Sequence, residues 1–191
     1  MRYRYIVLGF ASICVVLAYY GYQILMAPHR LFESVRLGDY ATFASLLTPE
    51  LAKRPYRLSL NNTLYLTHLA CSDSPPEFVN LLLENGADVH QKDSRGRSCV
   101  FHAIGRDDND VAVKNIEVLY RHDPTVLDDR ISSNGDTVLH FAISIRVDSR
   151  LIQRLIELGA DKSALNLKGE TPYQVLLKDP YKDDAVEKLL Q

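Results

Sequence analysis

Asn134 to Asp161 reads NGDTVLHFAISIRVDSRLIQRLIELGAD, and this stretch decides the fold. Its second half repeats apolar residues at the spacing of one helix face: Leu151, Ile152, Leu155 and Ile156. Gly159 follows shortly, and a glycine commonly ends a helix because it adopts a left-handed backbone without strain. The stretch therefore predicts a turn followed by two short helices.

The opening of this stretch recurs along the chain. Four segments align: Leu60 to Cys71 reads LNNTLYLTHLAC, Asp93 to Ile104 reads DSRGRSCVFHAI, Ser132 to Ile143 reads SSNGDTVLHFAI, and Asn166 to Leu177 reads NLKGETPYQVLL. The alanine near the end of the segment recurs after 33 residues from Ala70 to Ala103 and after 39 residues from Ala103 to Ala142. Repeats of this length form solenoids, because each short helix pair must bury its apolar face on a neighbour.

The best copy matches a known repeat at several positions together: Gly135, Thr137, Leu139, His140, Ala142, Leu155, Gly159, Ala160 and Asp161. This pattern resembles the ankyrin repeat, in which a turn, a T-P-L-H-x-A helix start, a second helix and a G-A-D hairpin entry follow one another. The resemblance implies an all-α solenoid of about five helix pairs. It also implies that His68 and His140 hydrogen-bond neighbouring backbone. Two copies depart from the pattern: the first has Tyr65, Leu66 and Thr67 for Thr, Pro and Leu, and the second has Phe101 for the histidine.

The resemblance divides the chain into an N-terminal segment and a repeat domain. We expect a signal anchor or transmembrane helix at residues 1–27 and the ankyrin-repeat domain at residues 28–191. Within the domain we expect an N-terminal cap at 30–58, repeats at 59–92, 93–131 and 132–165, and a C-terminal cap at 166–191. The six extra residues of the second copy are expected to leave the stack as surface loops, four around Asp107 to Asp110 and two near Asp128 and Asp129.

The N-terminal segment reads as a membrane span. Tyr5 to Ala27 contains no charged side chain over 23 residues, which is long enough for a helix to cross a hydrocarbon core of about 30 Å. Arg2 and Arg4 precede it, so the positive-inside rule places the short tail in the cytoplasm and the repeats on the other side of the membrane. The short tail, the single N-terminal anchor and the lack of eukaryotic sorting features lead us to expect a bacterial inner membrane, with the repeats in the periplasm. A cleavable secretory peptide, which would leave a soluble periplasmic protein, and a buried helix of the repeat domain are the alternatives.

Composition and motifs favour binding over chemistry. The chain has 22 Lys and Arg against 24 Asp and Glu, a balance that argues against general nucleic-acid binding. It contains no nucleophile elbow, phosphate loop or H-E-x-x-H motif, so we expect no enzyme, no cofactor and no metal. Cys99 and His102 supply only two ligands, fewer than a zinc site requires. The acidic run from Asp107 to Asp110 lacks the glycine and glutamate of a calcium loop and is read as a solvated, helix-capping loop.

The two cysteines of the repeats are expected to remain free thiols. Cys71 is equivalent to Ile104 in the next copy, five residues from Cys99. Neighbouring repeats stack about 10 Å apart, and this offset adds to the distance, which exceeds the Cα separation of about 7 Å that a disulfide tolerates.

The resemblance places the binding surface on the hairpin tips and on the exposed side of the first helix of each pair. Carried onto this chain, it gives these candidate partner-binding residues: Asn61, Asn62, Asp73, Lys92, Arg95, Arg97, Arg106, Ile131, Asn134, Asp136, Ile145, Leu165, Leu167 and Lys168. Among these, Ile131, Ile145, Leu165 and Leu167 are expected to form an exposed apolar strip beside a basic patch, as a protein interface requires.

We expect a non-enzymatic binding module that is anchored in the membrane and masks or neutralises a protein partner. Apart from this partner the module is expected to be a monomer. Its layout resembles immunity proteins that neutralise type VI secretion effectors such as phospholipases, which would make a secreted toxin or lipase the partner. The alternative is a cell-envelope scaffold or stress-response ankyrin protein without a toxin partner.

Overall fold

The computed structural model describes residues 26–59, 62–106 and 108–191. The expected membrane segment, residues 5–27, lies outside this part of the chain except for its last two residues. Across the three described ranges, no helix is both long enough and apolar enough to cross a membrane.

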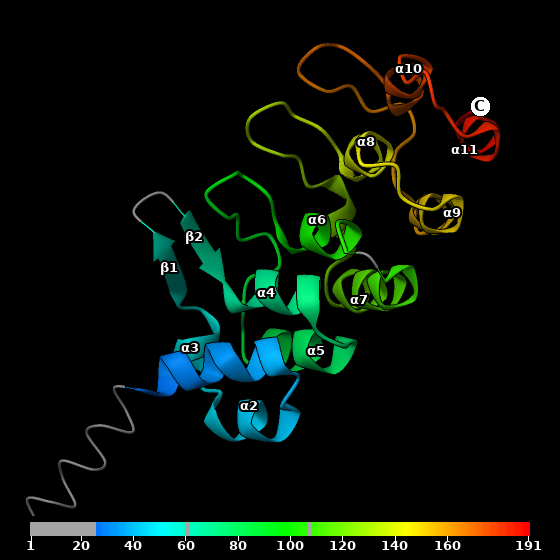
Figure 1. Ribbon diagram of the computed structural model, residues 1–191. Helices are drawn as coiled ribbons and strands as arrows, with labels where there is room; N and C mark the ends of the chain where they lie inside the picture. The colour runs from blue at the N-terminus through cyan, green and yellow to red at the C-terminus, as the bar shows by residue number, and fades with distance from the viewer. Residues whose placement is uncertain (1–25, 60–61, 107) are drawn as a thin grey trace, which may run out of the picture.

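The described residues form one row of stacked helix pairs (Figure 1). The first pair is the helix at residues 26–37 with α2 (Tyr40–Leu46), followed by the single turn α3 (Pro49–Ala52). The next pairs are α4 (Leu66–Asp73) with α5 (Pro76–Glu84), α6 (Cys99–Ile104) with α7 (Asn109–His122), α8 (Val138–Ser144) with α9 (Ser149–Glu157), and α10 (Pro172–Leu177) with α11 (Asp184–Leu190). A short 3₁₀ helix, η1 (Pro124–Asp128), follows α7.

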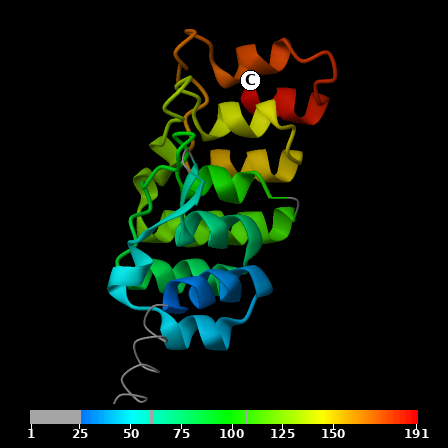
Figure 2. The ribbon, with the colours of Figure 1, turned by 60° about the vertical axis from the view of Figure 1, so that its left-hand side comes forward.

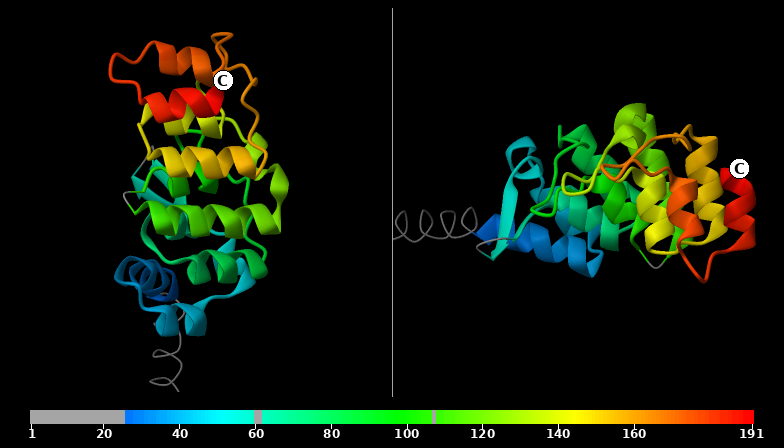
Figure 3. Two further views of the ribbon diagram at one scale, coloured as in Figure 1. Left: turned by 90° about the vertical axis from the view of Figure 1, so that its right-hand side faces the viewer. Right: turned by 90° about the horizontal axis from the view of Figure 1, so that it is seen from above.

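The pairs build two layers. The helices α4, α6, α8 and α10 form the layer next to the hairpin loops, and α5, α7, α9 and α11 form the outer layer, seen as a ladder in the left view of Figure 3. The C-terminus lies at the opposite end of the stack from the helix at residues 26–37 (Figure 2). The ankyrin-like solenoid expected from the repeats is therefore the observed architecture, while the exact boundaries of each repeat stay predictions.

The first helices begin where the sequence pattern indicates. Ahead of α8, the Thr137 N–H donates to His140 Nδ1 at 3.3 Å, and His140 Nε2 donates across the loop to the carbonyl of Glu170 at 2.8 Å. Ahead of α4, the Tyr65 N–H donates to His68 Nδ1 at 3.2 Å, and His68 Nε2 donates to the carbonyl of Gln91 at 2.7 Å. The expected backbone-binding role of both histidines is confirmed. Each imidazole joins the start of one helix to the next hairpin.

The hairpin tips are linked by backbone hydrogen bonds from one repeat to the next. Ser132 N–H donates to the Gly96 carbonyl at 3.1 Å, and Leu167 N–H donates to the Asn134 carbonyl at 2.9 Å. Gly135 lies between these contacts with a φ of +68°, a left-handed value that favours glycine. A Cβ there would also lie 2.8 Å from Leu167 Cγ, so the close approach of the last two hairpins requires glycine.

The fold departs from the expectations in two places. Strands β1 (Pro55–Ser59) and β2 (Asn62–Tyr65) pair in an antiparallel sheet, so the chain is mostly helical rather than purely α. Part of the expected surface loop is helical instead: Asn109 and Asp110 form the first turn of α7, which has 14 residues where α5 and α9 have 9. The helix-capping role of the acidic run is confirmed, because the Asp108 side chain accepts from the N–H groups of Asp110 and Val111.

The core is a continuous column of apolar side chains between the two layers. Leu139 of α8 and both Leu151 and Leu155 of α9 are fully buried there.

We expect Leu155→Ala to lower the free energy of unfolding by about 2 to 5 kcal/mol, because it removes buried methyl groups and leaves a cavity. Urea denaturation measures the loss. Leu177→Ala is the matched control, since that side chain is 49% exposed and its truncation should change the stability little. Equal effects of the two substitutions would contradict the described packing.

Candidate protein interface

A cleft crosses the middle of the stack beyond the C-terminal ends of α6 and α8. Its volume is about 410 Å³, within the range of ligand-binding sites. The lining combines apolar residues with three arginines: Arg97, Ile104, Gly105, Arg106, Asn109, Phe141, Ile145, Arg146, Val147 and Asp148. A second hollow of about 350 Å³ adjoins it and is lined by Ser72, Asp73, Gly105, Arg106 and Asp108. Together they form a depression that runs across three helix pairs.

Two of the three cleft arginines are paired within the domain. Arg97 contacts the carboxylate of Asp93 through Nη2 at 3.0 Å, and Arg146 contacts both carboxylate oxygens of Asp179 at 2.7 and 2.8 Å. Arg146 also has its guanidinium 5.2 Å from the centre of the Tyr181 ring. These contacts fix the side chains in place, so the walls of the cleft are largely formed before any partner arrives.

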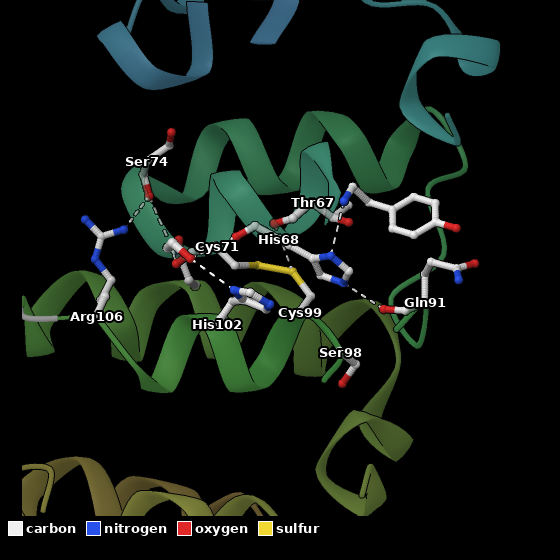
Figure 4. The surroundings of a disulfide bond; sticks show 12 residues. Thr67, His68, Cys71, Ser74, Gln91, Ser98, Cys99, His102 and Arg106 are labelled. Carbon is white, nitrogen blue, oxygen red and sulfur yellow. Dashed lines mark hydrogen bonds between the residues drawn. A yellow bond between two sulfur atoms is a disulfide. The ribbon is translucent and has the colours of Figure 1, made fainter. Parts of the chain in front are cut away.

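The seam between α4 and α6 contains a disulfide, so the expectation of free thiols at Cys71 and Cys99 is wrong. The two Cα atoms are 6.0 Å apart, and both residues are fully buried (Figure 4). The expectation assumed that equivalent residues of neighbouring repeats face each other. In fact, contacts across this seam join residues 28 to 32 apart: Cys71 with Cys99, Ser72 with His102, and Thr67 with Cys99. This displacement of α6 along α4 removes most of the assumed offset, and the small buried residues Ala70 and Ala103 allow close approach.

We expect replacement of Cys71 and Cys99 together by alanine to lower the free energy of unfolding by about 2 to 4 kcal/mol, because the bond restricts the unfolded chain. Urea denaturation of both proteins checks this. Cys14→Ala is the control, since that cysteine lies outside the repeats. In addition, alkylation of the denatured, unreduced wild-type protein should leave Cys71 and Cys99 unlabelled; labelling of both would contradict the disulfide.

Beside the disulfide, three polar side chains form a row that has the composition of a serine hydrolase triad. Ser72 Oγ lies 3.2 Å from His102 Nδ1, and His102 Nε2 donates to Asp93 Oδ2 at 3.0 Å. Ser72, however, lies in the last turn of α4, where the negative end of the helix dipole would oppose an oxyanion. Its hydroxyl also lies 3.1 Å from the His68 carbonyl, which it can bind as a donor. The row is therefore better explained as a structural link between α4, α6 and the second hairpin.

The electrostatics of this row agree with a structural link. Burial opposes the ionisation of Asp93, but hydrogen bonds from His102 and from Arg97 outweigh it and hold the pKa of that carboxyl well below its usual range. Burial also lowers the pKa of His68 to about 4, so its ring is neutral near pH 7. The neutral His68 ring stacks on His102 with centroids 4.7 Å apart, which packs the two first helices together.

The candidate partner-binding residues do not form one surface. Arg97, Arg106 and Ile145 line the main cleft, and Asp73 lines the adjoining hollow. The remaining described ones lie on or near the hairpins: Lys92, Arg95, Ile131, Asn134, Asp136, Leu165, Leu167 and Lys168. Asn61 lies outside the described residues, and so does the side chain of Asn62. Whether these side chains bind a partner stays a prediction.

Three of these residues differ from what the sequence suggested. Ile131 is 7% exposed, so it belongs to the core, and the expected apolar strip is reduced to Ile145, Leu165 and Leu167. The strip is also divided, because Leu165 and Leu167 belong to the last hairpin while Ile145 follows the C-terminal end of α8. Lys92 donates to the Arg130 carbonyl at 2.8 Å, and Arg97 pairs with buried Asp93, so neither is a free basic group on a solvated hairpin.

His90, which belongs to none of the sequence motifs, joins two successive hairpins. His90 Nδ1 contacts Asp129 Oδ1 at 2.9 Å, and Nε2 contacts Asp123 Oδ2 at 3.2 Å. Burial lowers the pKa of His90, but the hydrogen bonds to Asp129 and Asp123 outweigh it and raise that pKa above its ordinary value of 6.5. The pKa of Asp123 falls to about 2, mainly through its hydrogen bonds with Thr125. In the sequence, this ion pair is indicated only by the aspartates that flank η1, Asp123 and Asp129.

We expect the contribution of His90 to stability to depend on pH. Because its folded-state pKa is raised, the ion-pair stabilisation is complete below about pH 6.5 and is lost as the pH rises through the raised pKa. The wild-type protein should therefore exceed His90→Gln in free energy of unfolding by more at pH 6 than at pH 9, as measured by urea denaturation. His122→Gln is the control at an exposed histidine. A difference between wild type and His90→Gln that is equal at both pH values would contradict the ion pair.

The stacked helix pairs, the glycine-containing hairpin tips and the cleft define a repeat solenoid of the protein-binding class. The family model described as ankyrin repeats in three copies matches residues 67–166. The chain belongs to the ankyrin-repeat family, and its repeats are a protein-binding module.

Several curated proteins are similar to the repeats. Ankyrin repeat protein OPG189 of Variola virus is 31% identical over 114 residues, 60% of this chain and 19% of that protein. The B-cell lymphoma 3 protein homolog of Mus musculus is 33% identical over 109 residues, 56% of this chain and 23% of that protein. The E3 ubiquitin-protein ligase XBAT33 of Arabidopsis thaliana is 31% identical over 163 residues, 84% of this chain and 30% of that protein. The chain thus spans less than a third of each relative.

Proposed function

We propose that the protein is a membrane-anchored binding module whose repeats lie in the periplasm, where they mask or neutralise a protein partner. The observation that carries the binding role is the cleft of about 410 Å³, with an apolar wall and two arginines, Arg97 and Arg146, held in place by internal carboxylates. Clefts of this kind accept a protruding segment of another protein without much rearrangement of their own side chains.

Two further observations support the location. The apolar run from Tyr5 to Ala27 supports an anchor, with Arg2 and Arg4 retained in the cytoplasm. The buried Cys71–Cys99 disulfide supports an oxidising compartment, because disulfides form and persist in the periplasm and outside cells, whereas cytosolic thiols are kept reduced.

The partner that we propose is a toxic secreted effector, such as a phospholipase delivered by a type VI secretion system. This choice is supported by the layout alone, an apolar run followed directly by ankyrin repeats. A scaffold of the cell envelope without a toxin partner is the alternative, and the same experiment decides between them.

The test uses the genes next to the one that encodes this chain. Each neighbouring product is expressed with a periplasmic export signal, alone and together with the full chain. We expect one product to arrest growth and the full chain to restore it. Ile145→Asp, which places a charge in the cleft, should abolish the protection, while Leu37→Asp, at a residue that is 78% exposed and outside the cleft, should retain it. Absence of any toxic neighbour that the chain neutralises would favour the scaffold.

The location is tested in the same strains. A reporter that is active only outside the cytoplasm, fused to Gln191, should give signal. Activity of a cytoplasm-only reporter at the same position would contradict the proposed orientation.

A further inference from the structure

Arg106 lies where the cleft and the adjoining hollow meet, and it lines both of them. It follows the C-terminal end of α6, so its position is fixed by a helix rather than by a long loop. The cleft and the adjoining hollow also share Gly105, where the backbone is exposed because glycine has no side chain. A segment laid along the depression would therefore pass over Arg106.

The guanidinium of Arg106 is anchored but incompletely paired. Its Nη1 donates to the Ser74 carbonyl at 3.1 Å, and Ser74 is fully buried, so the group is held at a rigid point (Figure 4). Its Nε is buried without a hydrogen-bond partner. Within the described part of the chain, no carboxylate pairs with Arg106, in contrast to Arg97 and Arg146.

An incompletely paired guanidinium in a partly buried place favours a carboxylate ligand. Because the Nε has no exposed surface, a ligand in the cleft meets the rest of the guanidinium. The side chain is already held by its bond to Ser74, so a charge-assisted bond to an incoming acceptor costs little side-chain entropy. Carboxylates match the fork of donors on arginine and form charge-assisted bonds with it. The charge of Arg106, which no carboxylate of the described residues pairs with, thus selects an acidic group.

The rest of the lining limits the ligand to one acidic group beside an apolar one. Phe141, Ile145 and Val147 form an apolar wall, and Ile145 is 43% exposed, so this wall faces solvent in the unbound domain. Asp73, Asp108 and Asp148 lie in the lining of the two hollows and would repel a polyanion. This arrangement disfavours nucleic acid and favours a protein segment with a single carboxylate.

We propose that this cleft binds a segment of the partner in which one carboxylate, bound by Arg106, stands next to an apolar side chain that packs on Phe141 and Ile145. The inference rests on the proposed protein-binding function and specifies the chemistry that the partner presents. It assigns Arg106 the role of selecting for charge and the apolar wall the role of supplying contact area.

The test uses two amidated peptides, acetyl-Phe-Glu-Leu and acetyl-Phe-Gln-Leu, which differ in one charge. Each is titrated into the ¹⁵N-labelled full chain in detergent micelles, and NMR follows the backbone N–H signals of Phe141 and Val147 in the cleft lining, which every variant retains, together with the Nε–Hε signal of Arg106 in the wild type. We expect the Glu peptide to shift this signal and to bind about tenfold more tightly than the Gln peptide, the difference that one charge-assisted hydrogen bond provides. Equal affinities, or no binding of either peptide, would overturn the proposal.

Variants separate the role of Arg106 from an effect on folding. Arg106→Gln should lose the preference for Glu, and the matched control Arg95→Gln, at an exposed arginine outside the cleft, should keep it. Because Arg106→Gln also disturbs the bond to Ser74, Ile145→Asp provides a second variant at an exposed position, where the new carboxylate should compete with the peptide and abolish the preference. A preference for Glu that persists in both variants would overturn the proposal.

The outcome is independent of the growth assay. Protection from a toxic neighbour together with equal peptide affinities would overturn the carboxylate selection and leave the proposed function intact. A preference for the Glu peptide without protection from any neighbour would instead overturn the toxin partner and leave the chemistry of the cleft intact.

Discussion

No helix pair in the described part of the chain can bury its apolar face within itself, so the stack depends on the neighbouring pair that covers this face. Leu151 and Leu155 of α9, fully buried, are examples: their side chains fill the space between layers and between successive pairs. Short helices are marginal in water, so α6 and α8, with six and seven residues, owe their stability to this packing. The stack therefore gains stability by addition of pairs, and each pair is held in position by its packing on the neighbouring pairs.

Polar contacts add direction to this apolar column. His68 and His140 each bind the start of their own helix and the carbonyl of a following hairpin, and the hairpin tips bind one another through backbone groups. These hydrogen bonds form only at one displacement of a repeat along its neighbour, whereas apolar packing alone would tolerate several displacements. The cleft lies between repeats whose relative position these hydrogen bonds fix. Its shape therefore depends on how the repeats stack, and not on any single helix.

The sequence predicted the fold well because its signals are local. The T-P-L-H-like openings, the G-A-D segments and the 3.6-residue apolar period each act within one repeat, and the histidine contacts and helix order followed from them. Apart from the β1–β2 strands and the longer α7, the errors concern contacts between repeats. The displacement of α6 along α4 brings Cys71 next to Cys99. The hairpin that contains Ile131 turns this side chain into the core, although the sequence pattern placed it on the surface. The same limit applies to the site: Arg106 and Ile145 were identified as candidates, but the cleft that joins them depends on the geometry between α6 and α8.

The Cys71–Cys99 bond also determines how the domain responds to force. In a linear stack each pair holds only to its neighbours, so tension on the two ends peels off terminal pairs one after another. The bond joins α4 to α6 across 28 positions, and roughly 95 Å of chain between them cannot be drawn out while it is intact. The domain thus has one inextensible section, the chain from Cys71 to Cys99 with α5, between extensible sections that include the first helix pair on one side and α8 to α11 on the other. If the N-terminal run holds the chain in a membrane, an extensible first helix pair separates this section from the bilayer, and tension would unfold that pair before it reached the cross-linked section.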